Sequence, residues 1–258
     1  MKNLFFLFLL GPFLFSQNFQ TKDSLKILAE SNFKSMEVFE VKAEKLIPLR
    51  NYTYNRNKNE ISIKNSSDKN IEWLRTIIRF DNNYNITEVE KITEGMIISD
   101  KDNSLVKKQI SVITKYSYNN NNTVQINQYN DKGNLSFKLF KLFDDKNRII
   151  EQIKLFNIPD DIIVSEIEMY NWINNNSYNY EKLTFHAPKS RLTGIYKLNE
   201  YGDRESFTGS IYLNSNQEDA SFDFDKKIKK FDSKGNLIQV YKISNKVQTL
   251  IEERKIIY

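Results

Sequence analysis

The sequence predicts an all-β protein: an antiparallel meander of β-hairpins with one N-terminal helix packed on the sheet. Three observations support this prediction. A short turn-forming unit recurs along the chain, apolar and polar residues alternate from Arg50 onward, and only the segment before Pro48 has helical spacing. The sequence leaves open whether the sheet curves or closes in part.

The recurring unit consists of an aromatic residue, an Asp or Asn, two or three polar residues, a Gly or Asn, and an aliphatic residue. Copies of it, some degenerate, occupy residues 80–86, 129–135, 143–149, 198–204 and 231–237. In the last copy, Asp232 suits the first position of a type I turn, where its side chain accepts a turn N–H. Gly235 suits the left-handed position that closes the loop. Each copy therefore predicts a hairpin turn.

Between these turns the residues alternate with the period of a half-buried strand. In residues 110–118 one face carries Ile110, Val112, Thr114, Tyr116 and Tyr118. The segment from Phe137 to Phe143 is apolar on both faces, which is typical of a central strand covered on two sides. Asn-rich breaks at 119–122 and 174–176 separate such runs. The pattern favours one long meander.

The helix is predicted over Ser24 to Lys45, ending at Ile47 at the latest because Pro48 follows. Its apolar residues recur near helical spacing at Leu25, Leu28, Phe33, Met36 and Phe39. A helix that packs on the sheet and covers its end is the preferred interpretation. A helix that binds a partner is the alternative.

The first residues have the order of a secretory signal peptide. Lys2 supplies a positive charge, Leu4 to Phe15 is almost wholly apolar, and Ser16 is a small residue at a cleavage site. An uncleaved anchor is the alternative, but the run is shorter than the roughly 18–20 residues that span a bilayer. We expect cleavage after Ser16 and a periplasmic or secreted protein without a transmembrane span. The domain division is then 1–16 signal peptide, 17–48 leader and helix, and 49–258 hairpin-repeat domain.

The composition excludes several classes of site. The chain has no cysteine, which excludes a lipoprotein anchor, disulfides and thiolate metal sites. Its net charge of +5 comes from 38 Lys and Arg interleaved with 33 Asp and Glu. Such mixing is typical of solvated strand faces rather than of a one-signed stripe for phosphates. We therefore expect no nucleic-acid partner.

The repeated unit resembles that of YD-repeat (Rhs-like) proteins, which carry aromatic-Asp-x-x-Gly-Arg/Asn-Leu hairpins in series. The match is closest at Phe231 to Leu237 and at Tyr129 to Leu135. The chain is also similar to small secreted proteins of Bacteroidetes with a few degenerate copies. This resemblance implies extracytoplasmic β-sheet scaffolding, and it implies no catalytic residues.

The inventory of reactive side chains is small. His186 is the only histidine, which excludes a histidine metal triad, and no nucleophile elbow accompanies it. Asp223 with Asp225, and Glu166 with Glu168, are carboxylate pairs two residues apart that share a strand face. Such pairs suit Ca²⁺ or glycoside hydrolysis, but a solvated strand face has the same pattern. We assign no catalytic residue, no metal site and no cofactor.

Aromatic residues give the candidate binding site. Tyr170, Trp172, Tyr178 and Tyr180 flank the turn at 174–176 as pairs two residues apart, which places their rings together on one sheet face. An exposed ring platform would stack on sugars or hold a peptide. Buried rings would be ordinary cross-strand packing.

The leading functional hypothesis is a non-enzymatic exported binding or scaffold protein of the cell envelope that uses a sheet face or edge. Its partner would be an envelope glycan or another exported protein. The alternatives are a carboxylate-dependent hydrolase acting on a polysaccharide, and an immunity or chaperone-like partner of an exported protein. The hydrolase requires two carboxylates about 5–10 Å apart in an aromatic-walled cleft. The binding protein requires an exposed aromatic patch or an unprotected edge strand.

Overall fold

The computed structural model describes residues 22–66, 75–98, 105–119, 122–158, 161–186, 188–213 and 216–258. Within these ranges the chain forms helix α1 (Lys22–Glu30), a short 3-10 turn η2 (Arg56–Lys58) and a sheet of seventeen strands. The strands are β1 Ser35–Lys42, β2 Lys45–Asn55, β3 Glu60–Asn65, β4 Arg75–Phe80, β5 Ile86–Ile98, β6 Leu105–Asn119, β7 Thr123–Tyr129, β8 Leu135–Phe143, β9 Ile149–Ile158, β10 Asp161–Asn174, β11 Ser177–Thr184, β12 Ser190–Leu198, β13 Arg204–Leu213, β14 Asn216–Asp223, β15 Lys226–Phe231, β16 Leu237–Ser244 and β17 Val247–Ile257. The predicted signal peptide lies outside the described residues.

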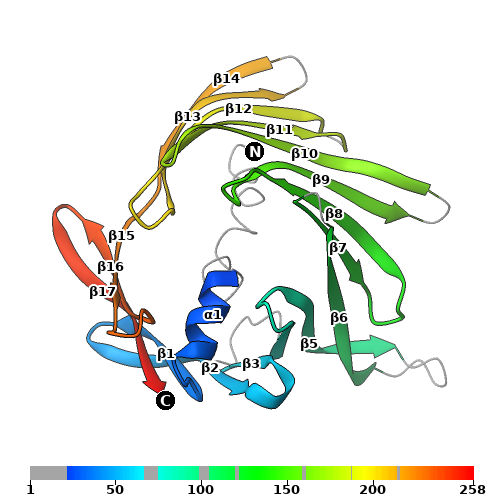
Figure 1. Ribbon diagram of the computed structural model, residues 1–258. Helices are drawn as coiled ribbons and strands as arrows, with labels where there is room; N and C mark the ends of the chain where they lie inside the picture. Colours follow the sequence, from blue (N-terminus) through cyan, green and yellow to red (C-terminus); the bar gives the residue numbers. More distant parts are fainter. Residues whose placement is uncertain are drawn as a thin grey trace.

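The sheet is an antiparallel meander. Each strand from β1 to β13 pairs with the next, β15 pairs with β16 and β16 with β17, and β17 returns to pair with β1. No ladder joins β14 to β15 in the part of the chain that is described, so the sheet is not closed. Figure 1 shows the sheet curling around a central space that contains α1. The predicted all-β meander with one N-terminal helix is confirmed.

The five repeat units form the predicted turns with one shared geometry. In each, the Asp or Asn side chain accepts hydrogen bonds from the backbone N–H groups two and four residues later, over 2.8–3.0 Å. The left-handed positions are Tyr84, Gly133, Asn147, Gly202 and Gly235, with φ between 58° and 82°. The chain is therefore a β-hairpin repeat protein.

The predicted helix over Ser24 to Lys45 is wrong beyond Glu30. Asn32 leaves the helix with a φ of 60°, and the following residues form β1 instead. Met36 and Val38 are each 1% exposed and alternate with exposed Glu37, which is the period of a strand. Because β1 is paired on both sides, by β2 and β17, its ladder hydrogen bonds outweigh the helical propensity of the segment.

The core has two clusters on the inner face of the sheet. One is centred on α1, whose Leu25 and Leu28 are 0% and 3% exposed and pack with Phe33 and inward residues of β1 to β5. The other is an aromatic cluster carried by β10 to β14, strands that Figure 1 places across the central space from α1. No helix among the described residues is long and apolar enough to span a membrane.

Candidate functional site

The four candidate binding residues meet on one face of the β10–β11 hairpin. In the ladder Tyr170 lies opposite Tyr180, and Trp172 lies opposite Tyr178. The ring centroids are 5.2 Å apart in the first pair and 4.8 Å apart in the second. The indole N–H of Trp172 donates to the carbonyl of Ile149 over 2.8 Å, which fixes the ring against β9. The structure thus brings all four rings together.

The ring cluster continues across the next strands, which the sequence pattern did not reveal. The ring centroid of Tyr196 on β12 lies 5.4 Å from that of Tyr178, and the ring centroid of Phe207 on β13 lies 4.7 Å from that of Tyr196. Phe207 is fully buried because Gly194 and Gly209 face each other beside its ring. The sequence signal that could have indicated this close packing is a Thr-Gly dipeptide in the middle of each of two consecutive strands, at 193–194 and 208–209.

The candidate rings are buried rather than displayed. Tyr170, Tyr178 and Tyr180 are 9%, 4% and 3% exposed, and Trp172 is half-buried. Burial raises the pKa of each of these tyrosines, so the phenols are neutral at physiological pH. The rings pack on one another and offer no exposed platform in this conformation. Their role in binding stays a prediction.

Charged groups border the ring cluster on the inner face. Glu168 is 8% exposed and accepts a close hydrogen bond from the Tyr170 hydroxyl. The ammonium of Lys182 lies 3.6 Å from Glu168 and 3.2 Å from Glu166. Burial lowers the pKa of nearby Lys141, and the charge of Glu168 opposes that shift. Lys182 therefore pairs with both carboxylates of the predicted pair, Glu166 and Glu168.

Arg204 closes the other side of the cluster. Its Nε donates to the Tyr178 hydroxyl over 3.1 Å, and its guanidinium lies 4.2 Å from the centroid of Tyr196. Burial opposes the charge of Arg204, but its interactions with Tyr178 and Tyr196 leave its pKa raised. A cation-binding role for the rings is thus already filled by a residue of the chain itself.

The other reactive side chains do not assemble a site. Asp223 is exposed, and Asp225 pairs with Lys242 over 2.9 Å. His186 is exposed, with its ring 6.2 Å from that of Phe156 in an edge arrangement. Across the described ranges, no group of three or more His, Cys, Asp and Glu side chains could hold a metal ion.

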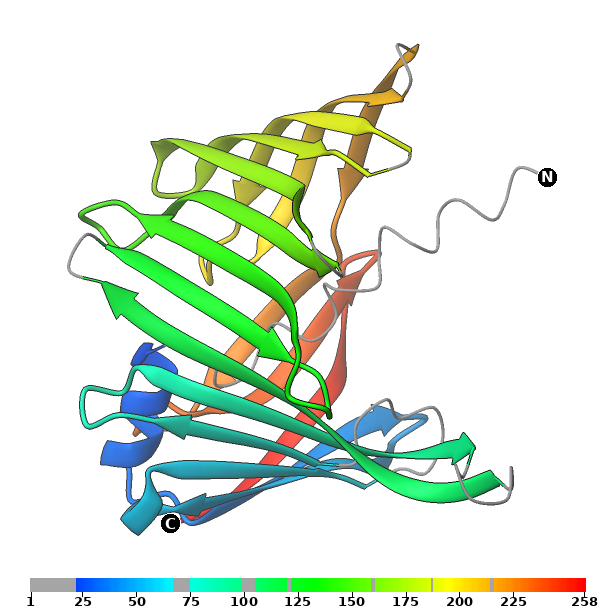
Figure 2. The same cartoon turned by 90° about the vertical axis from the view of Figure 1, so that its right-hand side faces the viewer.

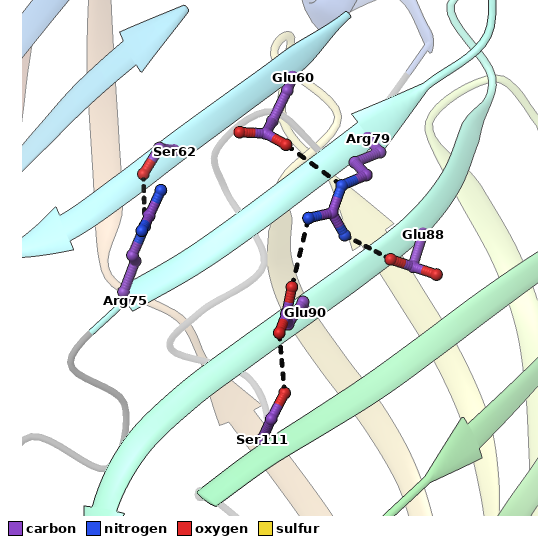
Figure 3. A network of polar contacts seen from close by, with 7 residues as sticks. All are labelled: Glu60, Ser62, Arg75, Arg79, Glu88, Glu90 and Ser111. Atoms are coloured by element: carbon purple, nitrogen blue, oxygen red, sulfur yellow. Dashed lines mark hydrogen bonds and ion pairs between the residues drawn. The ribbon is translucent and has the colours of Figure 1, made fainter. Parts of the chain in front are cut away.

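A second polar network lies on β3 to β6. Arg79 donates to Glu60 over 3.1 Å, to Glu90 over 3.3 Å, and to Glu88 in a closer contact, as Figure 3 shows. Burial opposes the charge of Arg79, but hydrogen bonds to Glu88 and Glu90 leave its pKa raised. Ser111 donates to Glu90 over 3.0 Å. The network joins four strands and has a structural role.

The two edge strands of the sheet, β14 and β15, differ in how their free edges are covered. Beside β15, Lys229 pairs with Asp203 over 2.6 Å and Lys226 pairs with Glu205 over 3.3 Å, so the β12–β13 turn lies against this strand. β14 pairs with β13 alone in the part of the chain that is described, and its residues 216–219 are exposed. β14 is therefore an unprotected edge strand.

Comparisons with known proteins identify no family. No protein-family model and no curated protein matches the chain. One solved structure, a porin-like protein from Bacteroides uniformis, aligns with 87% of this chain and 96% of its own, at 9% identity and a TM-score of 0.34. A likeness at this level carries no argument about function.

Proposed function

We propose that this chain is an exported, non-enzymatic binding or scaffold protein of the cell envelope that holds an extended segment of another exported protein on β14. The observation that carries the proposal is the eight-residue edge strand, which has a ladder partner on one side only among the described residues. Such an edge presents backbone N–H and C=O groups to which an incoming strand adds by main-chain hydrogen bonds.

The side chains of β14 indicate the charge of the segment that would bind. Glu218, Asp219 and Asp223 give the strand three acidic residues, and all three are exposed. Opposite charges facing each other across a strand pair stabilise it, and like charges destabilise it. The edge therefore favours a basic extended segment, and it disfavours pairing with β14 of a second copy.

We also propose that the protein is exported and that it descends from YD-repeat proteins. The predicted signal peptide at residues 1–16 supports a periplasmic or secreted location. The common turn geometry of the five repeat units supports descent from YD-repeat proteins. The carboxylate pair of half-buried Glu166 and buried Glu168, held by Lys182, gives the hydrolase alternative no comparable support.

Two proline variants test the edge directly. Successive residues of a strand direct their backbone N–H groups to opposite sides, so only one of Gln217 and Glu218 faces the free edge. Gln217→Pro and Glu218→Pro each remove one N–H at an exposed position. The variant that keeps the β13 ladder, identified by unchanged urea unfolding, should lose binding to an alternating Lys-Val octapeptide by about tenfold or more.

Fluorescence anisotropy with the labelled peptide gives the affinity, and an alternating Glu-Val octapeptide is the charge control. We expect the basic peptide to bind and to slow amide exchange along β14. The proposal is overturned if the stable proline variant binds the basic peptide as the unmodified chain does. Protection of some other strand would also contradict it.

A further inference from the structure

A hollow of about 470 Å³ lies where the end of α1 meets the start of β1, the end of β2, the turn at 232–236 and the C-terminal residue. Its lining residues are Asn32, Phe33, Lys34, Tyr54, Arg56, Lys234 and Tyr258. Figures 1 and 2 both place the C-terminus close to α1 and β1. The volume is within the range of small-ligand pockets.

The lining carries positive charge and no carboxylate side chain. Lys34, Arg56 and Lys234 are all exposed, so an incoming ligand can reach them. Asp232 belongs to the adjoining turn, but its carboxylate accepts hydrogen bonds from the Tyr258 hydroxyl and from the backbone N–H groups of Lys234 and Asn236. The three cationic side chains of the lining therefore favour an anionic ligand.

Two of the cations are held in place by the end of α1. The Nη2 of Arg56 donates to the carbonyl of Ala29 and to the Oδ1 of Asn32, each over 3.3 Å. The Nζ of Lys234 donates to the carbonyl of Ser31 over 3.1 Å. Within the described ranges these bonds leave Nε and Nη1 of Arg56 as donors toward a ligand. Anchored cations lose less freedom on binding than mobile ones.

Aromatic rings stand directly beside these cations. Lys234 Nζ lies 3.4 Å from the centroid of Tyr258, and the Arg56 guanidinium lies 5.8 Å from that of Tyr54. Buried Phe33 stacks on Tyr54 at 6.4 Å. The hollow thus combines positive charge, an amide and two tyrosines, and the faces of Tyr258 and Tyr54 already carry Lys234 and Phe33. A bare inorganic anion would use the charge alone, whereas a carboxylated sugar would also use the amide through its hydroxyl groups.

We infer that this hollow binds an acidic sugar residue, of the hexuronic acid class, within an anionic glycan. The guanidinium of Arg56 and the ammonium of Lys234 bind the carboxylate, and Asn32 contacts the hydroxyl groups. The site is separate from β14, so it does not depend on strand addition at that edge.

The repeat provides a matched control for its test. Lys234 and Lys146 occupy the same place in the copies 231–237 and 143–149, and their backbone N–H groups donate to Asp232 and Asp144 over 2.9 and 3.0 Å. Lys146 is not a lining residue of the hollow. K234Q and K146Q therefore remove equal charge from equivalent turns, and only the first removes it from the site.

Calorimetry with trigalacturonate, and with maltotriose as the neutral ligand, gives the affinities. We expect trigalacturonate to bind the unmodified chain and K146Q equally, and to bind K234Q and R56Q about tenfold more weakly. Because K234Q and R56Q also loosen contacts to α1, K34Q is the third lining variant, and urea unfolding reports the stability of each. K34Q should weaken binding without a change in unfolding.

Several results would overturn the inference. They are the absence of trigalacturonate binding at millimolar concentration, equal affinity for maltotriose, and equal loss in K146Q and K234Q. Equal affinity for a triglutamate peptide would indicate a general anion site and would also overturn it. A failed strand-addition test on β14 changes none of these outcomes. A failed sugar-binding test likewise leaves the proposal of strand addition at β14 unaffected.

Discussion

At the scale of single residues, glycines meet two different requirements, and the pair Gly194 and Gly209 allows β12 and β13 to approach closely. A Cβ built on Gly194 would lie 2.4 Å from the Thr208 carbonyl oxygen and 2.7 Å from the ring of Phe207. Gly133 is the contrasting case, since its φ is +79° and nothing lies within 4 Å of an added Cβ. One glycine is required by packing against backbone, and the other by the conformation of a turn.

Substitution by alanine separates these two requirements. We expect Gly194→Ala to lower the free energy of unfolding by about 2 kcal/mol or more, because the backbone itself must move. Gly133→Ala should lower it by about 1 kcal/mol, the cost of a left-handed alanine. Urea unfolding measures both. Equal losses would show that the close approach at Gly194 is not a real constraint.

The carboxyl of Asp232 gives a pH-dependent prediction. Burial acts to raise its pKa, but hydrogen bonds from Tyr258 and from the turn amides hold it below the ordinary value of 3.8. A lowered pKa in the folded state contributes stability that is fully present above pH 3.8 and is lost as the pH falls through the folded value. An NMR titration should show the pKa of Asp232 rising in Y258F. An unchanged value would show that Tyr258 does not stabilise the carboxylate.

At the scale of elements, α1 acts as a core element and not as a long amphipathic helix. It has nine residues, and it buries Leu25 completely while Ile27 remains 38% exposed. Its C-terminal end is held by cations from η2 and from the turn at 232–236, so contacts distant in the sequence fix its position. The helix therefore serves both the core and the hollow.

Substitutions on the two faces of α1 should differ widely. Leu25→Ala should lower the free energy of unfolding by about 2–5 kcal/mol, as expected for a large-to-small change in a packed core. Ile27→Ala on the exposed face should change it by much less. If urea unfolding gave similar losses for both variants, α1 would not be packed on the sheet as described.

At the scale of the whole molecule, the sheet is open between β14 and β15 even though only residues 224 and 225 join these strands. One extended segment thus pairs first with β13 and then with β16. Phe224 continues the first ladder, since its N–H donates to the Glu205 carbonyl over 2.9 Å. The edges differ because the β12–β13 turn covers β15 and leaves β14 accessible.

Hydrogen exchange should report this asymmetry in the free protein. Amides of β14 are expected to exchange faster than those of β12, which is paired on both sides by β11 and β13. β1, paired by β2 and β17, is a second reference. Protection of β14 equal to that of β12 would mean that its edge is paired in solution, which would contradict the open sheet.

Much of the fold follows from local sequence. Asp232 and Gly235 predict their turn because the hydrogen bonds and the left-handed conformation involve residues within the turn itself. Strand alternation is equally local, since it depends only on which neighbours are apolar. The secondary structure of residues 31–42, in contrast, depends on distant residues. Met36 and Val38 fit a helix and a strand alike until β2 and β17 pair with them.

The all-β class, the hairpin turns and the grouping of Tyr170, Trp172, Tyr178 and Tyr180 therefore follow from local sequence alone. The burial of these rings depends on the three-dimensional fold, because Tyr196 and Phe207 come from later strands. The three-dimensional fold also keeps the sheet open at β14 and brings Ser31 to Lys234 beside the hollow. Those contacts join residues far apart in the chain, and a local pattern specifies what each residue favours but not which distant residue it will meet.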